Sequence, residues 1–290
     1  MVRLSERRRA VAYLTGDYDI SERRACSVLS MHRSSFRYSR RCRISSGDHQ
    51  QVIARSEQYS YWGYRKLHEL VRGDGHRIGR EQVRLVRRRE GLQVPVRVIK
   101  RRSPGASTKH IATATHPNHV WSYDFIFDRT EDARTLKCLT VVDEFTRMGL
   151  DIPLGRGFSS GQVIRTLADL MERWGPPECL RSDNGSEFIA DRVRKWLKDN
   201  QIGTHYIDPG SPWQNPYNES FNSIFRITCL NRWLFLNQSE ARVTIRDWLN
   251  EYNTVRPHGS LQGRTPIQFF KDWRSRNPGR TTMKLPKSLT

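Results

Sequence analysis

The chain has 290 residues, 36% of them hydrophobic, with 8 Trp, 10 Tyr and 11 Phe, and its formal net charge at pH 7 is +20. This apolar and aromatic content excludes a chain that is disordered throughout. The sequence has no apolar run of about 18 residues and no apolar signal-peptide core near its start, so we expect no membrane span and a cytoplasmic, nucleoid-associated protein.

The positive charge is concentrated in the first part of the chain. Residues 1–110 contain 26 Lys and Arg against 10 Asp and Glu, whereas residues 111–290 contain 24 against 20. This asymmetry predicts a basic region that binds a polyanion and a second region with a different task. The 5 cysteines are scattered and odd in number, which is typical of free thiols in a reducing compartment.

Residues 1–50 are expected to form a DNA-binding module. Three short helices are predicted between residues 5 and 40, and Ser21 is the candidate N-cap of the second. The third carries Arg33 and Arg37, which suits the recognition helix of a helix-turn-helix. A generic basic three-helix bundle is the alternative interpretation of the same pattern.

A second helical DNA-binding module is expected over residues 51–94, with two amphipathic helices on either side of the turn GDGHRIG. Val83 and Val86 are predicted to face its core, and the arginines of the second helix form a basic edge that exceeds what solvation requires. The candidate DNA contacts on this edge are Arg80, Arg84, Arg87 and Arg88. Residues 95–115 are basic and contain Pro and Gly, so they are expected to be an extended linker.

From residue 116 to 275 the pattern changes to alternating strands and helices. Three consecutive strand candidates predict an antiparallel meander; they cover residues 120–128, 136–143 and 148–154. A helix, a strand, a helix and a strand are expected next, at 159–174, 178–183, 186–200 and 202–208, and then three helices at 219–233, 238–253 and 265–276. This order predicts an α/β, ribonuclease-H-like catalytic core with a mixed five-stranded sheet flanked by helices. Residues 276–290 are expected to be a basic tail.

Three acidic residues stand on three different elements of this core. Asp124 lies in the first strand candidate, Asp183 follows a short apolar strand, and Glu219 opens a helical pattern with 35 residues between it and Asp183. Mg²⁺ prefers oxygen ligands and retains several waters, so such a cluster predicts two hard divalent cations and phosphoryl transfer. Asp143 and Glu144 also follow a strand; a hydrogen bond to neighbouring backbone is the favoured role for Asp143.

Polar residues surround the third acid. On a helix that opens near Tyr217, positions 219, 222, 223 and 226 fall on one face. Arg226 on that face is suited to bind the DNA backbone. The other candidate DNA contacts in this part of the chain are Asn215, Asn218 and Asn222.

The motifs YDF, SDNGSEF and NESFNSIFR around the three acids resemble the catalytic core of DDE transposases and retroviral integrases. The segments YWGYRKLHELVRGDGHRIGREQVRLVRRREGL and EYNTVRPHGSLQGRTPIQF narrow the resemblance to insertion-sequence family three. The transposase of that family is made from two overlapping frames, and this chain is similar to the downstream-frame product, OrfB. The resemblance covers most of residues 58–270, and Arg226 stands where relatives often have Lys.

The resemblance implies a DNA transposase of a bacterial insertion sequence. Water would cut a strand first, and the 3′-OH set free would then attack a second phosphodiester. Asp124, Asp183 and Glu219 would hold two Mg²⁺ ions, for which Mn²⁺ can substitute. The implied partners are double-stranded DNA (the terminal inverted repeats and the target), further copies of this chain in a dimer or larger assembly, and an upstream-frame OrfA product or fusion.

Two rival functions remain open at this point. One is a DNA-binding regulator or inhibitor of transposition that does not use the acids, which the intact triad argues against. The other is a ribonuclease-H-like nuclease that cleaves without joining, which the basic helical modules make the weaker choice.

Overall fold

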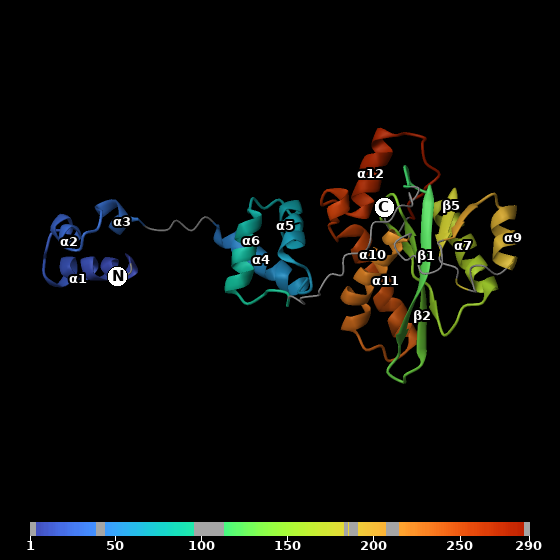
Figure 1. The fold of residues 1–290 in the computed structure, drawn as a ribbon, viewed down its shortest axis with the longest axis horizontal. Helices are drawn as coiled ribbons and strands as arrows, with labels where there is room; N and C mark the ends of the chain where they lie inside the picture. The colour runs from blue at the N-terminus through green and yellow to red at the C-terminus, as the bar shows by residue number, and fades with distance from the viewer. Residues whose placement is uncertain are drawn as a thin grey trace, which may run out of the picture. The chain divides into compact units, whose positions relative to one another are not determined.

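The structure is a computed structural model, and it describes residues 4–38, 44–95, 113–182, 185, 191–206 and 215–286. The chain forms two compact units, residues 1–49 and 50–290 (Figure 1). In the parts of the chain that the structure describes, no helix is both long and apolar enough to cross a membrane.

The first unit consists of three short helices, as predicted: α1 (Leu4–Asp17), α2 (Glu22–Val28) and α3 (Arg33–Arg37). Its small core contains Val11, Ala25 and Met31. The Nε atom of Arg8 donates to the Ser35 carbonyl at 2.8 Å, which ties α1 to α3. Helix α3 is only five residues long, because the backbone turns extended at Tyr38.

The second helical module contains one helix more than the sequence pattern predicted. Helices α5 (Tyr64–Gly73) and α6 (Arg80–Arg89) match the two expected, and α4 (Ser46–Gln58) precedes them. Helix α4 buries only Val52 and Ser56, so its sequence lacks the apolar period that would have revealed it.

The region after residue 116 contains a mixed sheet, as predicted. Its strands in chain order are β1 (Val120–Arg129), β2 (Thr135–Asp143), β3 (Gly149–Asp151), β4 (Leu154–Gly155), β5 (Cys179–Ser182) and β6 (Gly203–Tyr206). They lie in the order β3-β2-β1-β5-β6, with β4 also paired to β2. Strands β1, β2 and β3 are antiparallel neighbours, whereas β5 runs parallel to both β1 and β6.

The predicted count of five strands is wrong: six strands lie within the described ranges, because the expected third strand is split in two. Pro153 lies at the break between β3 and β4 and has no backbone N–H to donate to the ladder. Its carbonyl still accepts the backbone N–H of Leu139 at 2.9 Å, so the chain stays against β2.

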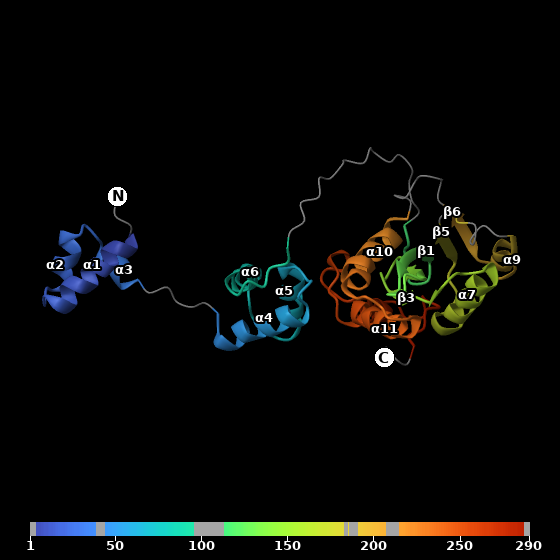
Figure 2. The same ribbon diagram turned by 90° about the horizontal axis from the view of Figure 1, so that it is seen from below.

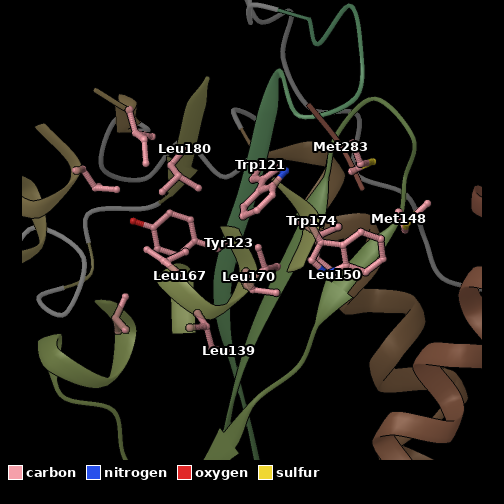
Figure 3. Packing of buried hydrophobic residues seen from close by; sticks show 14 of the residues in the cluster. Trp121, Tyr123, Leu139, Met148, Leu150, Leu167, Leu170, Trp174, Leu180 and Met283 are labelled. Carbon is pink, nitrogen blue, oxygen red and sulfur yellow. The ribbon is translucent and has the colours of Figure 1, made fainter. Parts of the chain in front are cut away.

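Helices cover both faces of the sheet (Figure 1; Figure 2). Among the described helices, α7 (Ser160–Trp174) and α9 (Asp191–Asp199) pack on one face, and α10 (Pro216–Thr228) and α11 (Gln238–Thr254) pack on the other. The chain also contains α12 (Pro266–Arg276) and the short 3-10 helices Leu230–Arg232 and Gly259–Leu261. Side chains alternate along β1, so Trp121 and Tyr123 pack against Leu167 and Leu170 of α7 (Figure 3), whereas Ile126 faces α10 and α11.

Aromatic packing fixes α10 against α11. Phe221 of α10 meets Tyr252 of α11 edge to face, with ring centroids 4.8 Å apart. Gly149 of β3 lies beneath this contact, and Asn253 of α11 binds both backbone groups of Gly149, with hydrogen bonds of 3.0 and 2.8 Å. The edge of the sheet, α10 and α11 are therefore one packed unit.

The second helical module contacts the end of α11. The hydroxyl of Tyr61 donates to the Glu251 carboxylate at 2.5 Å, and the Arg232 guanidinium lies 4.0 Å from the centre of the Tyr61 ring. His258 is buried nearby against Tyr252, and burial lowers the pKa of its imidazole to about 3, so it packs as a neutral ring.

We predict that Gly149→Ala lowers the free energy of unfolding. A Cβ atom at this position would lie 2.5 Å from Leu249 and 2.8 Å from Phe221, so the packed helices would have to move. Overpacking of this kind costs about 1–3 kcal/mol, measurable by urea denaturation. Gly157→Ala is the matched control, because a Cβ there meets nothing within 4 Å; equal stability of the two variants would contradict the prediction.

Candidate active site

Asp124 lies in the middle of β1 on the face that α10 covers. One carboxylate oxygen accepts the backbone N–H of Phe125 at 2.7 Å, and the other accepts the side-chain amide of Asn222 at 2.9 Å. Thr140, directly opposite on β2, donates its hydroxyl to the Asp124 carbonyl at 3.1 Å. The carboxylate is half-buried. Hydrogen bonds from β1 and from α10 fix its orientation.

Glu219 lies in the first turn of α10, one turn before Asn222. The helix begins at Pro216, three residues earlier than predicted, because proline at the first turn is pre-set for helix and loses no hydrogen bond there. The Glu219 side chain is exposed. Even so, the protein around the carboxyl group keeps part of the water away from it, and this desolvation raises the pKa of Glu219. The sequence correctly placed residues 219 and 222 on one face.

Asp183, the second predicted acid, lies outside the described residues, as do Asn184 and residues 207–214. The described part of β5 ends one residue earlier, at Ser182, and Arg181 of β5 is in register with Ser122 of β1. Along the sequence, Asp124 follows Ser122 by two residues and Asp183 follows Arg181 by two residues. The meeting of the three carboxylates in one site stays a prediction.

The donor set around Asp124 suits a hydrated cation. Among the described residues, no group of three His, Cys, Asp or Glu could hold a metal by itself. The Asn222 amide is bonded to Asp124 through its nitrogen, while its oxygen is buried without a hydrogen-bond partner in the part of the chain that the structure describes. A buried acceptor beside a carboxylate is what a metal-bound water requires, since that water donates hydrogen bonds.

Two of the predicted DNA contacts are buried side chains, and their contact with DNA stays a prediction. Asn218 is fully buried; it accepts the Thr140 hydroxyl at 3.0 Å and donates to the Thr140 carbonyl at 3.4 Å. Asn215 is 4% exposed. Asn218 lies in α10, which starts at Pro216, and Asn215 directly precedes the helix. Thr140, which joins Asp124 to Asn218, was not foreseen from the sequence, where it is one of several threonines near strands.

Arg226 lies two turns after Glu219 and is half-buried. Its guanidinium donates to the carbonyl of Phe127 in β1 at 2.5 Å. This hydrogen bond holds the later part of α10 along β1, on the same side as Asn222 and Asp124. Its predicted contact with DNA is not tested by this arrangement.

The candidate recognition helix of the first unit is exposed and basic. Arg33 and Arg37 both donate to the Glu22 carboxylate, at 2.9 and 2.8 Å. Two guanidinium groups share one carboxylate, so the surface keeps a net positive charge. Their predicted contact with DNA remains an expectation.

The basic edge of α6 is smaller than predicted. Arg80 and Arg88 are exposed, and Arg84 is paired with Glu81 one turn earlier. Arg87 is only 2% exposed, and its Nη1 atom donates to the Trp62 carbonyl at 2.7 Å. The predicted exposure of Arg87 is wrong: it lies four residues after Val83 and one after Val86, so it shares their inward face.

Two family models, each described as an integrase core domain, match residues 114–212 and 200–266. An uncharacterized 39.2 kDa protein of insertion element IS476 from Xanthomonas euvesicatoria is 36% identical over 273 residues, which are 93% of this chain and 78% of that protein. The putative transposase InsK of insertion sequence element IS150 from Escherichia coli is 24% identical over 223 residues, covering 73% of this chain and 78% of that protein.

Among solved structures, the cryoEM structure of the simian T-cell lymphotropic virus intasome in complex with PP2A regulatory subunit B56 gamma resembles this chain with a TM-score of 0.51. The sequence identity is 16%, and the match covers 81% of this chain and 79% of that one. At this identity the likeness shows the fold alone, and it confirms the predicted α/β integrase-type core.

We predict that Arg87→Ala destabilises the second helical module, whereas Arg88→Ala does not. Removing the Arg87 guanidinium leaves the buried Trp62 carbonyl unpaired, which costs about 1–3 kcal/mol. Arg88, the next residue on the same helix, is exposed and supplies the matched control. Thermal denaturation of both variants measures the difference, and a stable Arg87→Ala protein would contradict the buried role.

Proposed function

Because this chain belongs to the integrase-core family of insertion-element transposases, we propose that it is the enzyme that cleaves and joins DNA strands at the ends of its element. In this proposal water cuts a strand and the resulting 3′-OH attacks a second phosphodiester. Asp124, Asp183 and Glu219 are the proposed catalytic carboxylates.

The observation that carries the proposal is the hydrogen bond between Asn222 and Asp124. It brings the helix that bears Glu219 directly over the strand that bears Asp124, so two of the three acids lie on facing surfaces. A cation that both carboxylates bind would lie between these surfaces, because Mg²⁺ takes oxygen ligands from a few carboxylates and completes its shell with water. The arrangement therefore supports a cation site between β1 and α10.

We propose that the three carboxylates hold two Mg²⁺ ions, with Mn²⁺ as a substitute. When bound, these ions supply Lewis-acid stabilisation of the attacking and leaving oxygens in phosphoryl transfer. The protein residues have separate tasks. Asn222 orients Asp124, its free oxygen accepts a hydrogen bond from a water of the site, and α10 fixes where Glu219 stands relative to β1.

We propose that the exposed arginines bind DNA backbone outside the active site. Arg33 and Arg37 of α3 and Arg80 and Arg88 of α6 are exposed. Contacts between such side chains and phosphates position a protein on DNA without reading its sequence. Arg84, which is paired with Glu81, belongs to the same proposed surface. Arg226 and Asn222 would contact the DNA strand that lies next to Glu219. Two element ends must meet, so a dimer or larger assembly is part of the proposal, together with an upstream-frame product or fusion.

We predict that Glu219→Gln abolishes joining without weakening DNA binding. Short labelled duplexes that carry the element's ends would be incubated with Mg²⁺ or Mn²⁺, and cleaved and joined products would be separated on denaturing gels. The amide keeps the size of Glu219 but removes a charged metal ligand. Glu172→Gln, the same change at an exposed position of α7, is the matched control.

Each outcome of this experiment selects one function. Metal-dependent joining that is lost in Glu219→Gln but kept in Glu172→Gln supports the transposase. DNA binding without cleavage in the wild-type chain, alone and with the upstream-frame product, supports the regulator. Cleavage without joining supports a nuclease.

We predict that Asn222→Ala weakens Mn²⁺ binding roughly 10- to 100-fold, the usual cost of removing a group that orients a metal ligand. The Asp124 carboxylate would lose its hydrogen bond from Asn222 of α10. Calorimetric titration with Mn²⁺ measures the affinity. Asn250→Ala on the exposed side of α11 is the control, and identical affinities in both variants would contradict the role.

A further inference from the structure

The turn that follows β2 is tied to the start of β1. Asp143 is fully buried, and one of its oxygens accepts the backbone N–H and the hydroxyl of Thr146 at 2.8 and 2.7 Å. Its other oxygen accepts the backbone N–H of Asn118 at 2.9 Å. The predicted role of Asp143, hydrogen bonding to neighbouring backbone, is confirmed. The turn is thus rigid and attached to the segment that leads into the Asp124 strand.

The same turn is tied to β5. Glu144 and Arg181 are 1% and 3% exposed, and the Nη1 atom of Arg181 donates to both Glu144 oxygens at 3.0 and 2.9 Å. The backbone N–H of Glu144 also donates to the Val120 carbonyl at 3.0 Å. Burial raises the pKa of Glu144 to about 7, and the Arg181 guanidinium is the largest influence that lowers it. Arg181 stands two residues before Asp183 in the chain.

A third contact ties the turn to α10. The Arg147 guanidinium lies 3.8 Å from the centre of the Tyr217 ring, and it also donates to the Glu144 carbonyl. Tyr217 is in the first turn of α10, two residues before Glu219. Arg147 has a left-handed backbone with φ of 62°. Residues other than glycine rarely adopt this backbone conformation, so contacts with the surrounding residues must stabilise it.

We propose that the turn over residues 143–147 is the positioning element of the active site, and that Arg147 is the positioning residue that sets α10 relative to the two strands. Three elements are attached to this one turn. Strand β1, which bears Asp124, is attached through Asn118 and Val120. Strand β5, which Asp183 follows in the sequence, is attached through Arg181, and α10, which bears Glu219, through Tyr217. This inference rests on the proposed function of the three carboxylates. None of these groups touches the reacting atoms in the proposal; they act through the elements that carry the acids.

Arg147→Gly separates positioning from folding. Glycine adopts a positive φ without strain, so the variant keeps the turn but loses the contact with Tyr217. We expect kcat for strand cleavage to fall on the order of 10- to 100-fold, the effect of displacing a catalytic group by about 1 Å. We also expect weaker binding of Mn²⁺, measured without DNA by the electron paramagnetic resonance signal of the free ion. The Kd for DNA and the melting temperature should not change.

Gln201→Gly is the matched control, because Gln201 also has a left-handed backbone, with φ of 58°, and lies on an exposed turn after α9. It should leave all four quantities unchanged. Wild-type Mn²⁺ affinity and kcat in Arg147→Gly would overturn the inference, and so would a melting temperature that falls in step with activity. A wild-type chain that cleaves neither alone nor with the upstream-frame product would refute the proposed function, while the Mn²⁺ measurement would still decide the positioning role.

Tyr217→Leu tests the partner of Arg147. If the two side chains act through one contact, the single variants and the double variant should lose Mn²⁺ affinity by the same factor. Losses that multiply in the double variant would show independent roles and overturn the inference.

Discussion

The attachment of α10 to the sheet is the interaction on which the rest of the core depends. Its apolar side, with Phe221 and Phe225, is buried against α11. Its polar side carries a series of hydrogen bonds, in which Asn218 reaches Thr140, Asn222 reaches Asp124, and Arg226 reaches the Phe127 carbonyl. Apolar burial supplies most of the stability, but it is not directional. The hydrogen bonds fix the register of the helix along β1, and with it the place of Glu219.

This design explains why so many polar residues near the acids are buried. A half-buried carboxylate needs fixed partners, because an unpaired polar group in a low-dielectric setting is costly. Asp124 finds them in its own strand and in α10, and Asp143 finds them in its turn. Glu219 is more exposed, which suits the role proposed for it, that of a carboxylate that adapts to a cation and a DNA strand.

The sequence reached the fold class and the family correctly because both depend on local patterns. Alternating strands, capped amphipathic helices and short acidic motifs can be recognised in a single stretch of sequence, without knowing what packs against it. The errors were of another kind. Helix α4 was missed because tertiary packing, not its own periodicity, holds it, and the third strand was taken as continuous across Pro153. Arg87 is predicted to be exposed because arginine is seldom buried. In the structure it is buried, because its guanidinium donates a hydrogen bond to the backbone carbonyl of Trp62 in another segment.

By itself, the sequence determined that the chain carries an integrase-type core that contains Asp124, Asp183 and Glu219 and an excess of basic residues before it. It did so because residue identity and spacing fix chemistry and element order. Only the tertiary structure decided which polar side chains face inward. Asn218 and Asn222 are four residues apart on one helix, yet one closes against β2 and the other meets Asp124. Likewise, Arg181 of β5 is 37 residues from Glu144 in the sequence, and only the fold brings it to the turn that contains Glu144 and Arg147. The sequence does not show this contact, because hydrogen bonds act only over a few ångströms.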